Sequence, residues 1–149
     1  MTYKRFCLIS WSKNIPVLLT KTDEFPEAGF DAIKKINPKK IIIIGGEKAV
    51  GRGGEERLLS YTVVDRIWGE TRVETSIEIA KTIKPDKVII TNYDSNIEAA
   101  VSSYLYNAPI IYVNSEKLDI VLEFLKTYKP KVLFIDVDES TKKRIKEGI

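Results

Sequence analysis

An internal duplication restricts the folds open to this chain more than any other feature of its sequence. Asn-Ile-Pro-Val-Leu-Leu-Thr at residues 14–20 returns as Asn-Ala-Pro-Ile-Ile-Tyr-Val at residues 107–113, and Pro38 before one apolar run has its counterpart in Pro130 before another. The offsets, 107 − 14 = 93 and 130 − 38 = 92, show that the register is kept across most of a copy. Chance similarity between apolar segments seldom keeps register in this way, so the pattern indicates a duplicated structural unit.

Proline precedes each of three apolar runs. Helix-like segments end at Pro38, Pro85 and Pro130, which are 47 and 45 residues apart, and the runs Ile-Ile-Ile-Ile, Val-Ile-Ile and Val-Leu-Phe-Ile follow. Proline disfavours the α conformation of the residue before it, and continuous β-branched runs are typical of strands covered on both faces. We therefore expect central parallel strands at these three places, with two strand–helix units in each interval.

Helical patterns alternate with the expected strands. The clearest covers residues 72–83, because Thr71-Arg72-Val73-Glu74 is a capping box that opens an apolar stripe. The expected helices are residues 28–36, 72–83, 97–106, 118–128 and 140–147, and the expected strands are residues 17–20, 41–44, 62–68, 88–90, 110–113 and 132–135. Residues 5–12 fit either a helix, like their counterpart 98–105, or a strand, and we favour the helix.

Alternating strands and helices with right-handed crossovers predict an α/β fold. We expect a three-layer Rossmann-like or flavodoxin-like domain with a mostly parallel sheet. The length of 149 residues suits one domain over residues 1–149, in which residues 14–50 are echoed by residues 107–141.

Composition removes several classes of function. The chain has no histidine and one cysteine, Cys7, which excludes Ser-His or Cys-His catalysis, imidazole metal sites and internal disulfides. The net charge of +3 is spread over interspersed Lys and Glu, so we expect no nucleic-acid partner. No apolar run nears the roughly 20 residues of a membrane span, and the N-terminus lacks the pattern of a signal peptide, which favours a cytoplasmic location. The abundance of Lys, Ile and Glu is typical of a heat-adapted source.

Two glycine-rich segments are candidate ligand sites. Gly45 and Gly46 directly follow the 41–44 strand, where α/β proteins place ligands, but the sequence around them matches neither nucleotide-binding glycine pattern. A tight turn is the alternative interpretation, and we favour it. Gly51-Arg52-Gly53-Gly54, followed by Arg57, predicts a flexible basic loop that is either a connector or a clamp for an anion.

A charged and aromatic cluster is expected where a strand ends and a helix begins. Its members are Arg66, Trp68, Gly69, Arg72 and Glu74. Two guanidinium groups, an indole and a carboxylate suit the recognition of a ligand. The alternative, which we weigh equally, is that Trp68 is a core residue, that Arg66 and Glu74 are solvated, and that Arg72 lies along the helix surface.

Acidic residues follow two other expected strands. Asp94-Ser95-Asn96 and Asp136-Val137-Asp138-Glu139 offer oxygen ligands for a cation, but Asp94, Ser95 and Ser140 are also ordinary turn and N-cap residues. We favour capping and expect no metal site and no cofactor. The basic residues between 142 and 146 are expected to form a solvated helix face.

The order of these pieces resembles the cell wall binding repeat type 2 family. The resemblance covers residues 14–137 and rests on Pro-Val-Leu-Leu-Thr at 16–20, Ile-Ile-Ile-Ile-Gly-Gly at 41–46, and Arg-Ile-Trp-Gly-Glu-Thr-Arg-Val-Glu-Thr-Ser at 66–76. Thr71 and Val73 stand where the family motif has Asp and Tyr. The motif positions that remain are Gly69, Arg72, Glu74 and Thr75.

This resemblance implies a noncatalytic module that attaches to anionic cell-wall polymer and packs in a threefold arrangement, so we expect a homo-oligomer, with a trimer as one form. The alternatives are a small cytoplasmic enzyme or binding protein for a phosphorylated metabolite or nucleotide, and a plain interaction protein. The expected ligand-binding residues are Arg72, Glu74, Thr75, Gly69, Gly45, Gly46, Arg52 and Arg66.

Overall fold

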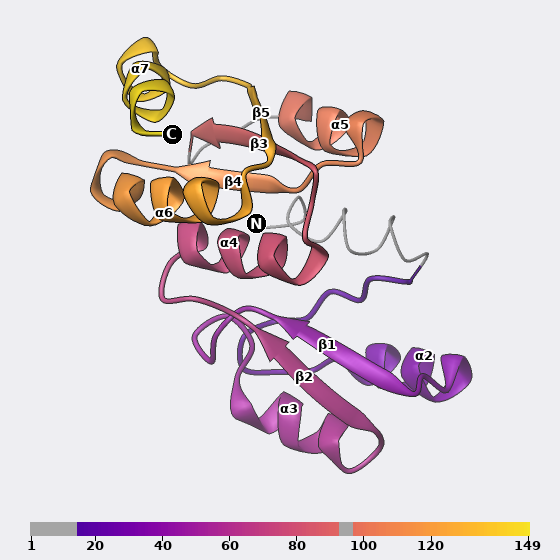
Figure 1. Ribbon diagram of the computed structural model, residues 1–149. Coiled ribbons are helices and arrows are strands. Elements are labelled where there is room, and N and C mark those ends of the chain that lie inside the picture. The colour runs from indigo at the N-terminus through magenta and orange to yellow at the C-terminus, as the bar shows by residue number, and fades with distance from the viewer. Residues whose placement is uncertain (1–14, 93–96) are drawn as a thin grey trace.

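Helices and parallel strands alternate along the computed structural model of the protein, which describes residues 15–92 and 97–149 (Figure 1). This is the predicted α/β fold. The elements are α2 (Glu27–Ile36), β1 (Lys40–Ile44), α3 (Arg52–Leu59), β2 (Val63–Ile67), α4 (Arg72–Ile83), β3 (Lys87–Asn92), α5 (Ile97–Tyr106), β4 (Ile110–Val113), the 3-10 helix η2 (Ser115–Lys117), α6 (Leu118–Tyr128), β5 (Lys131–Phe134) and α7 (Glu139–Gly148). The predictions for residues 5–12, Cys7 and Asp94-Ser95 lie outside the described residues.

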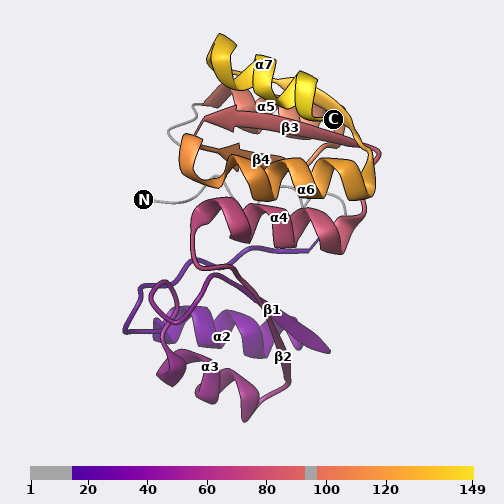
Figure 2. The same cartoon turned by 60° about the vertical axis from the view of Figure 1, so that its left-hand side comes forward.

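The strands form two parallel sheets where the sequence predicted one. β1 pairs with β2, and a second sheet has the order β4-β3-β5. Figures 1 and 2 show the smaller sheet with α2 and α3, and the larger sheet with α4 to α7. Of the three proline-led strands only β3 is central, since β1 and β5 each have one strand neighbour in the part of the chain that the structure describes. The expectation of central strands was wrong for these two, because a continuous apolar run also occurs at a sheet edge.

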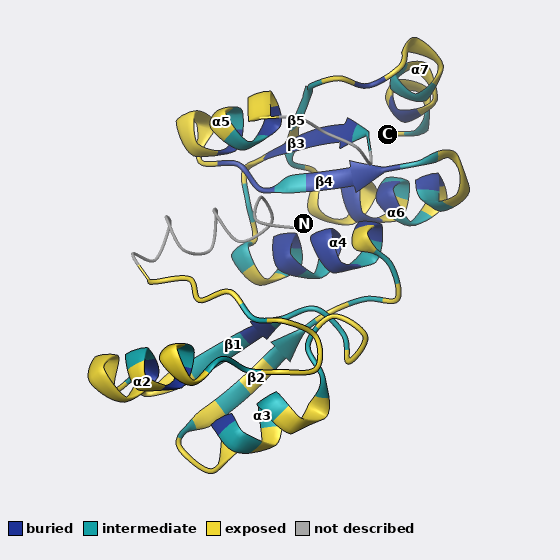
Figure 3. Cartoon of the chain, turned by 180° about the vertical axis from the view of Figure 1, so that it is seen from behind, coloured by how far each residue is buried: buried dark blue, intermediate teal, exposed yellow. Residues whose placement is uncertain are grey.

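The larger sheet is covered on both faces. Val88 and Ile90 of β3 belong to a cluster that includes residues of α4 and α6 and Ile145 of α7, and all three side chains are fully buried. Ile89, which points to the other face, packs with Ala99 of α5. The buried residues in Figure 3 are concentrated in β3 and β4 and along α4 and α6. This half of the chain therefore has the three layers that the sequence predicted.

The smaller sheet has its own apolar cluster, and that cluster explains why α3 is a helix. Phe30 and Ile33 of α2, Ile43 of β1 and Leu58 of α3 are buried together. The prediction of a flexible loop at residues 51–54 is thus wrong, because burial of Leu58 outweighs the poor helix propensity of the two glycines in the first turn. Arg57 lies over the ring of Phe30 at 4.1 Å.

Residues 17–20 are not a strand, contrary to the prediction. They belong to neither sheet, and the side chains of Val17, Leu18 and Leu19 are exposed. An extended apolar segment becomes a strand only when another strand supplies hydrogen bonds, and the described residues supply none to it. Local sequence carries no information about that missing neighbour.

Several helices end on a left-handed residue. Asn37, Lys84 and Lys129 follow α2, α4 and α6 with φ between 48° and 51°, and each donates its backbone N–H to the carbonyl four residues earlier. Each is followed directly by proline, so the helix stops there and the next strand begins within three residues.

Candidate functional site

The candidate site is the edge of the smaller sheet at which β1 and β2 end. Ile44 and Ile67 are register partners, so the loops that follow the two parallel strands leave from the same edge. We call residues 45–52 and 66–75 the strand-end rim. The rim contains every residue that the sequence nominated: Gly45, Gly46, Arg52, Arg66, Gly69, Arg72, Glu74 and Thr75.

The guanidinium of Arg66 joins three parts of the rim and its surroundings by hydrogen bonds. Its guanidinium donates to the carbonyl oxygens of Gly45 at 2.7 Å and Val50 at 3.0 Å, and to the Oε2 atom of Glu55 at 2.7 Å. Only 11% of its side chain is exposed, and the ion pair lowers the pKa of Glu55. These three partners occupy three of the five N–H donors of the guanidinium, so Arg66 links the loop after β1 to α3.

Backbone hydrogen bonds also hold the Gly45-Gly46 loop in a tight turn. Gly45 has φ +117°, which favours glycine, and its N–H donates to the Ile67 carbonyl at 2.9 Å. The Gly46 carbonyl accepts from Ala49 and Val50 at 2.9 Å each. A Cβ at Gly46 would lie 3.1 Å from the ring of Trp68, so the indole rests on this glycine. The tight-turn interpretation accounts for both glycines.

The N-terminus of α4 is capped internally. Thr71 Oγ1 accepts from the Val73 N–H at 3.2 Å, and Glu74 Oε2 accepts from the Thr71 N–H at 2.6 Å, which forms the predicted capping box. Thr75 Oγ1 accepts from the Gly69 N–H at 3.0 Å and donates to the Thr71 carbonyl at 2.8 Å. These bonds use backbone N–H groups that an anion would otherwise meet at a helix start.

Glu74 also joins α4 to the turn before α6. Its Oε1 atom lies 2.8 Å from Lys117 Nζ, and this contact lowers the pKa of Glu74 and raises that of Lys117. Lys117 was not nominated from the sequence, since it is 43 residues away and has no motif around it. Glu74 is therefore neither simply solvated nor an open ligand group.

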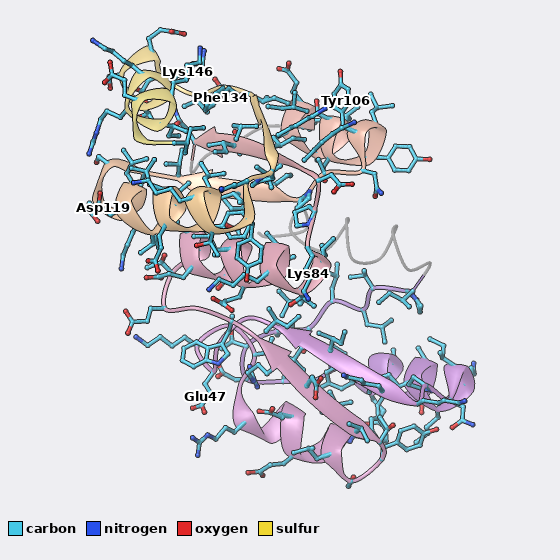
Figure 4. The ribbon with its side chains drawn as sticks, viewed as in Figure 1. Glu47, Lys84, Tyr106, Asp119, Phe134 and Lys146 are labelled. Carbon is cyan, nitrogen blue, oxygen red and sulfur yellow. The ribbon has the colours of Figure 1, made fainter. Side chains whose placement is uncertain are left out.

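Trp68, Arg52 and Arg72 are among the large side chains of the rim that are exposed. The indole of Trp68 is 52% exposed, which excludes the core alternative for this residue. Arg52 lies in the first turn of α3 and donates from Nε to Glu47 at 2.7 Å, a pair in which both side chains are more than half exposed. Glu47 extends outward from the rim in Figure 4. Arg72 is exposed in the first turn of α4.

Outside the rim, an acidic residue caps α7 and a hollow lies between α4 and α6. Asp138 caps α7 by accepting from Ser140 at 2.6 Å and Thr141 at 2.9 Å, and these bonds lower the pKa of Asp138. The cap is therefore Asp138, whereas Ser140, which the sequence nominated, lies in the first turn of the helix. Within residues 15–92 and 97–149 no group of three metal-ligating side chains occurs, and no helix has the length and apolar character needed to cross a membrane. A hollow of about 380 Å³ runs between α4 and α6, where Phe124 stacks on Tyr128.

Known proteins share both the sequence and the fold. The chain is 33% identical over 109 residues to the amidase enhancer of Bacillus subtilis (strain 168), which covers 70% of this chain and 16% of that protein. It is 28% identical over 116 residues to the N-acetylmuramoyl-L-alanine amidase LytC of the same strain, covering 74% of this chain and 23% of the relative. The solved structure of Cwp8 from Clostridium difficile matches with a TM-score of 0.75 and 26% identity, over 97% of this chain and 26% of Cwp8.

The chain thus spans about a quarter or less of the length of these proteins. The family model of cell wall binding domain 2 matches residues 66–145, which begin in β2 with Arg66 and reach α7. Sequence, fold and family model agree, and the matched domain is a cell wall binding module. The chain belongs to the cell wall binding domain 2 family.

Proposed function

We propose that this module is noncatalytic and holds an anionic cell-wall polymer, a glycan or polyol chain bearing phosphate or carboxylate groups, at the strand-end rim. Arg52 and Arg72 would pair with the anionic groups, and the exposed face of Trp68 would pack on the sugar or polyol between them. The remaining nominated residues would shape the rim through hydrogen bonds within the protein.

The observation that carries the proposal is the placement of the two arginines. Each stands in the first turn of a helix, α3 or α4, and both helices leave the same edge of the β1–β2 sheet. A cation at a helix N-terminus is disfavoured by the helix dipole by about 0.3–1 kcal/mol. A polyanion bound across the rim would add a favourable charge interaction at both positions.

Cosedimentation with washed Bacillus subtilis cell walls tests the proposal, using walls before and after chemical removal of their anionic polymers. We expect the wild-type chain to pellet with intact walls at low salt and to be released as salt rises, because counterions compete for the arginines. Arg52→Ala and Arg72→Ala should each weaken pelleting by up to about 5-fold, as expected for exposed charge pairs worth about 0.2–1 kcal/mol.

Arg144→Ala is the matched control, because it removes the same charge from an exposed position on α7. Its pelleting should equal that of the wild type. A chain that stays in the supernatant at low salt refutes wall binding. Equal losses for Arg144→Ala and Arg72→Ala refute the rim as the site, and undiminished pelleting with stripped walls refutes the anionic polymer as the ligand.

We also propose that the chain self-associates, so that several rims face one polymer. The support is the family membership together with the large apolar side chains that the described surface leaves exposed. Multiple weak sites on one assembly raise the overall affinity without any new contact at each site. Sedimentation velocity at micromolar concentration measures this directly, and a mass of 17.0 kDa at all concentrations would refute it.

A further inference from the structure

The hollow between α4 and α6 has the size and the walls of a small binding pocket. Figures 1 and 2 show the two helices side by side, and the volume of about 380 Å³ between them lies within the roughly 300–1,000 Å³ that is usual for ligand pockets. Ile77 of α4 and Ile120 and Phe124 of α6 give the hollow apolar walls. Ile77 and Phe124 are buried in the core cluster of the larger sheet, so these walls are fixed in place. The walls therefore suit an aliphatic chain.

Charged groups surround the apolar walls, and carboxylates outnumber amines among them. Glu74, Glu78 and Glu123 line the hollow together with one amine, that of Lys81. Glu74 is paired with Lys117 at 2.8 Å, and Glu78 is paired with Lys81 at 2.7 Å. Within the described part of the chain, the carboxylate of Glu123 forms no ion pair. One negative charge at the hollow is thus left without a cation, in a chain whose net charge is +3.

Lys81 shows which kind of cation the hollow accepts. Its unbranched side chain carries the ammonium group to Glu78, and 42% of that side chain is exposed. The hydrogen bond that Lys81 donates to Glu78 raises the pKa of Lys81, and the charge of Glu123 on the facing helix adds to the rise. An ammonium group on a straight chain is therefore stabilised by carboxylates from both helices.

The aromatic pair that lines the hollow offers a further attraction for a cation. Phe124 and Tyr128 stack with their ring centroids 4.8 Å apart and an interplanar angle of 22°. Phe124 is buried, whereas Tyr128 remains 39% exposed and so presents part of its ring to an incoming group. The electron-rich face of an aromatic ring attracts an ammonium ion. Apolar walls, a carboxylate without a partner and an exposed ring all favour the same class of ligand.

We propose that the hollow between α4 and α6 binds a primary alkylammonium group, the group that ends a lysine side chain. The aliphatic part lies against the apolar walls, the ammonium donates to Glu123, and the ring of Tyr128 lies beside it. Lys81 competes with this ligand, because its own ammonium is attracted by the same carboxylates. Binding here is independent of the proposed polymer site, since the hollow takes the opposite charge and neither Arg52 nor Arg72 lines it.

NMR titration of the isotope-labelled full chain with Nα-acetyl-lysine N-methylamide tests the site. We expect amide shifts confined to α4 and α6 and a dissociation constant of about 1–10 mM, because one exposed charge pair and a short aliphatic chain bind weakly. The blocked norleucine analogue has the same straight chain without the ammonium group. It should bind about 3-fold to 5-fold more weakly, which measures the contribution of the charge.

Two variants test the roles of the charged residues in opposite directions. Glu123→Gln should weaken binding of the lysine probe about 2-fold to 5-fold, because the amide keeps the shape of the side chain and loses its charge. Lys81→Met should strengthen binding by a similar factor, because it removes the competing ammonium and leaves Glu78 available. Glu56→Gln is the matched control, since Glu56 is also an exposed glutamate on a helix, α3, and does not line the hollow. The amide spectrum of each variant shows directly whether it is folded.

The free diamine cadaverine distinguishes two sources of the ammonium group. Cadaverine that binds at least as tightly as the lysine probe indicates a free alkylamine, and weaker binding indicates a lysine side chain of a polypeptide; both results support the site. Four results overturn it: no shifts at about ten times the expected dissociation constant, equal binding of the norleucine analogue, an unchanged dissociation constant in Glu123→Gln, or weaker binding by Lys81→Met.

Discussion

Gly69 is the position at which a single methyl group should cost the most stability. A Cβ built there lies 2.8 Å from both the Glu74 carbonyl carbon and the Thr75 nitrogen, against an ordinary contact distance of about 3.5–4.0 Å. Gly69→Ala therefore forces the first turn of α4 away from the loop by roughly 1 Å. That movement weakens the Gly69–Thr75 hydrogen bond and the capping box, each worth about 1 kcal/mol.

Adding the steric cost, we expect the free energy of unfolding of Gly69→Ala to fall by about 2–4 kcal/mol, which lowers Tm by about 6–12 °C for a domain of this size. Urea denaturation followed by circular dichroism measures the change. Gly53→Ala is the control, because no heavy atom lies within 4 Å of its added Cβ and alanine favours the α3 helix. The reasoning is wrong if the free energy of unfolding of Gly69→Ala lies within about 0.5 kcal/mol of the wild-type value. It is also wrong if Gly69→Ala and Gly53→Ala change the free energy of unfolding by the same amount.

Three further outcomes follow from buried polar contacts. Ser76→Ala should lower the free energy of unfolding by about 1–3 kcal/mol, because Ser76 Oγ accepts from the buried Tyr112 N–H at 3.1 Å and alanine removes that acceptor. Thermal denaturation measures the loss, and an unchanged Tm would contradict it. Arg66→Met should cost about 2–4 kcal/mol in urea denaturation, since Glu55 and two carbonyls lose their partner, and a stabilised variant would refute this role. The pKa values of Glu55 and Glu74 are lowered in the folded state, so their contribution to stability is present above the unfolded value of about 4.3 and is lost as the pH falls through the folded values. As the pH falls below about 4, the urea concentration at the midpoint of unfolding should therefore decrease, and it should decrease less steeply with pH in Glu74→Gln than in the wild type. The same pH dependence in the two proteins would contradict this.

Local signals located most of the helices. The capping box at Thr71 and Glu74 fixed the start of α4, and the segments 97–106 and 118–128 have the predicted bounds, because caps and apolar stripes depend on residues within one or two turns. The errors have non-local causes. Helix α3 exists because Leu58 meets Phe30 of α2, and residues 17–20 are irregular because no described strand pairs with them. The sequence of residues 51–54 does not show the contact with α2, and that of residues 17–20 does not show whether a strand lies beside it.

Local signals also indicated where the candidate residues lie, whereas their contacts depend on residues far along the chain. The residues nominated within 45–52 and 66–75 do lie at one edge of the β1–β2 sheet, since parallel strands end at a common edge, and their role as a binding site stays a prediction. The role of Arg66 depends on Glu55, eleven residues away, and that of Glu74 on Lys117, 43 residues away. Such pairings become visible only in the folded chain. The exposure of Trp68 was also open, because an indole beside a glycine suits a core or a surface equally well.

The left-handed helix ends bear on the internal duplication that the sequence predicts. Asn37 and Lys129 occupy equivalent positions of the two predicted copies, with 129 − 37 = 92, and their φ values are 48° and 49° although one side chain is a short amide and the other a long amine. If the two segments descend from one ancestral unit, the backbone conformation of this turn has outlasted the identity of the residue that adopts it. Each turn then still directs the strand that follows it, β1 or β5, into a sheet, while the side chains around the turn are free to diverge.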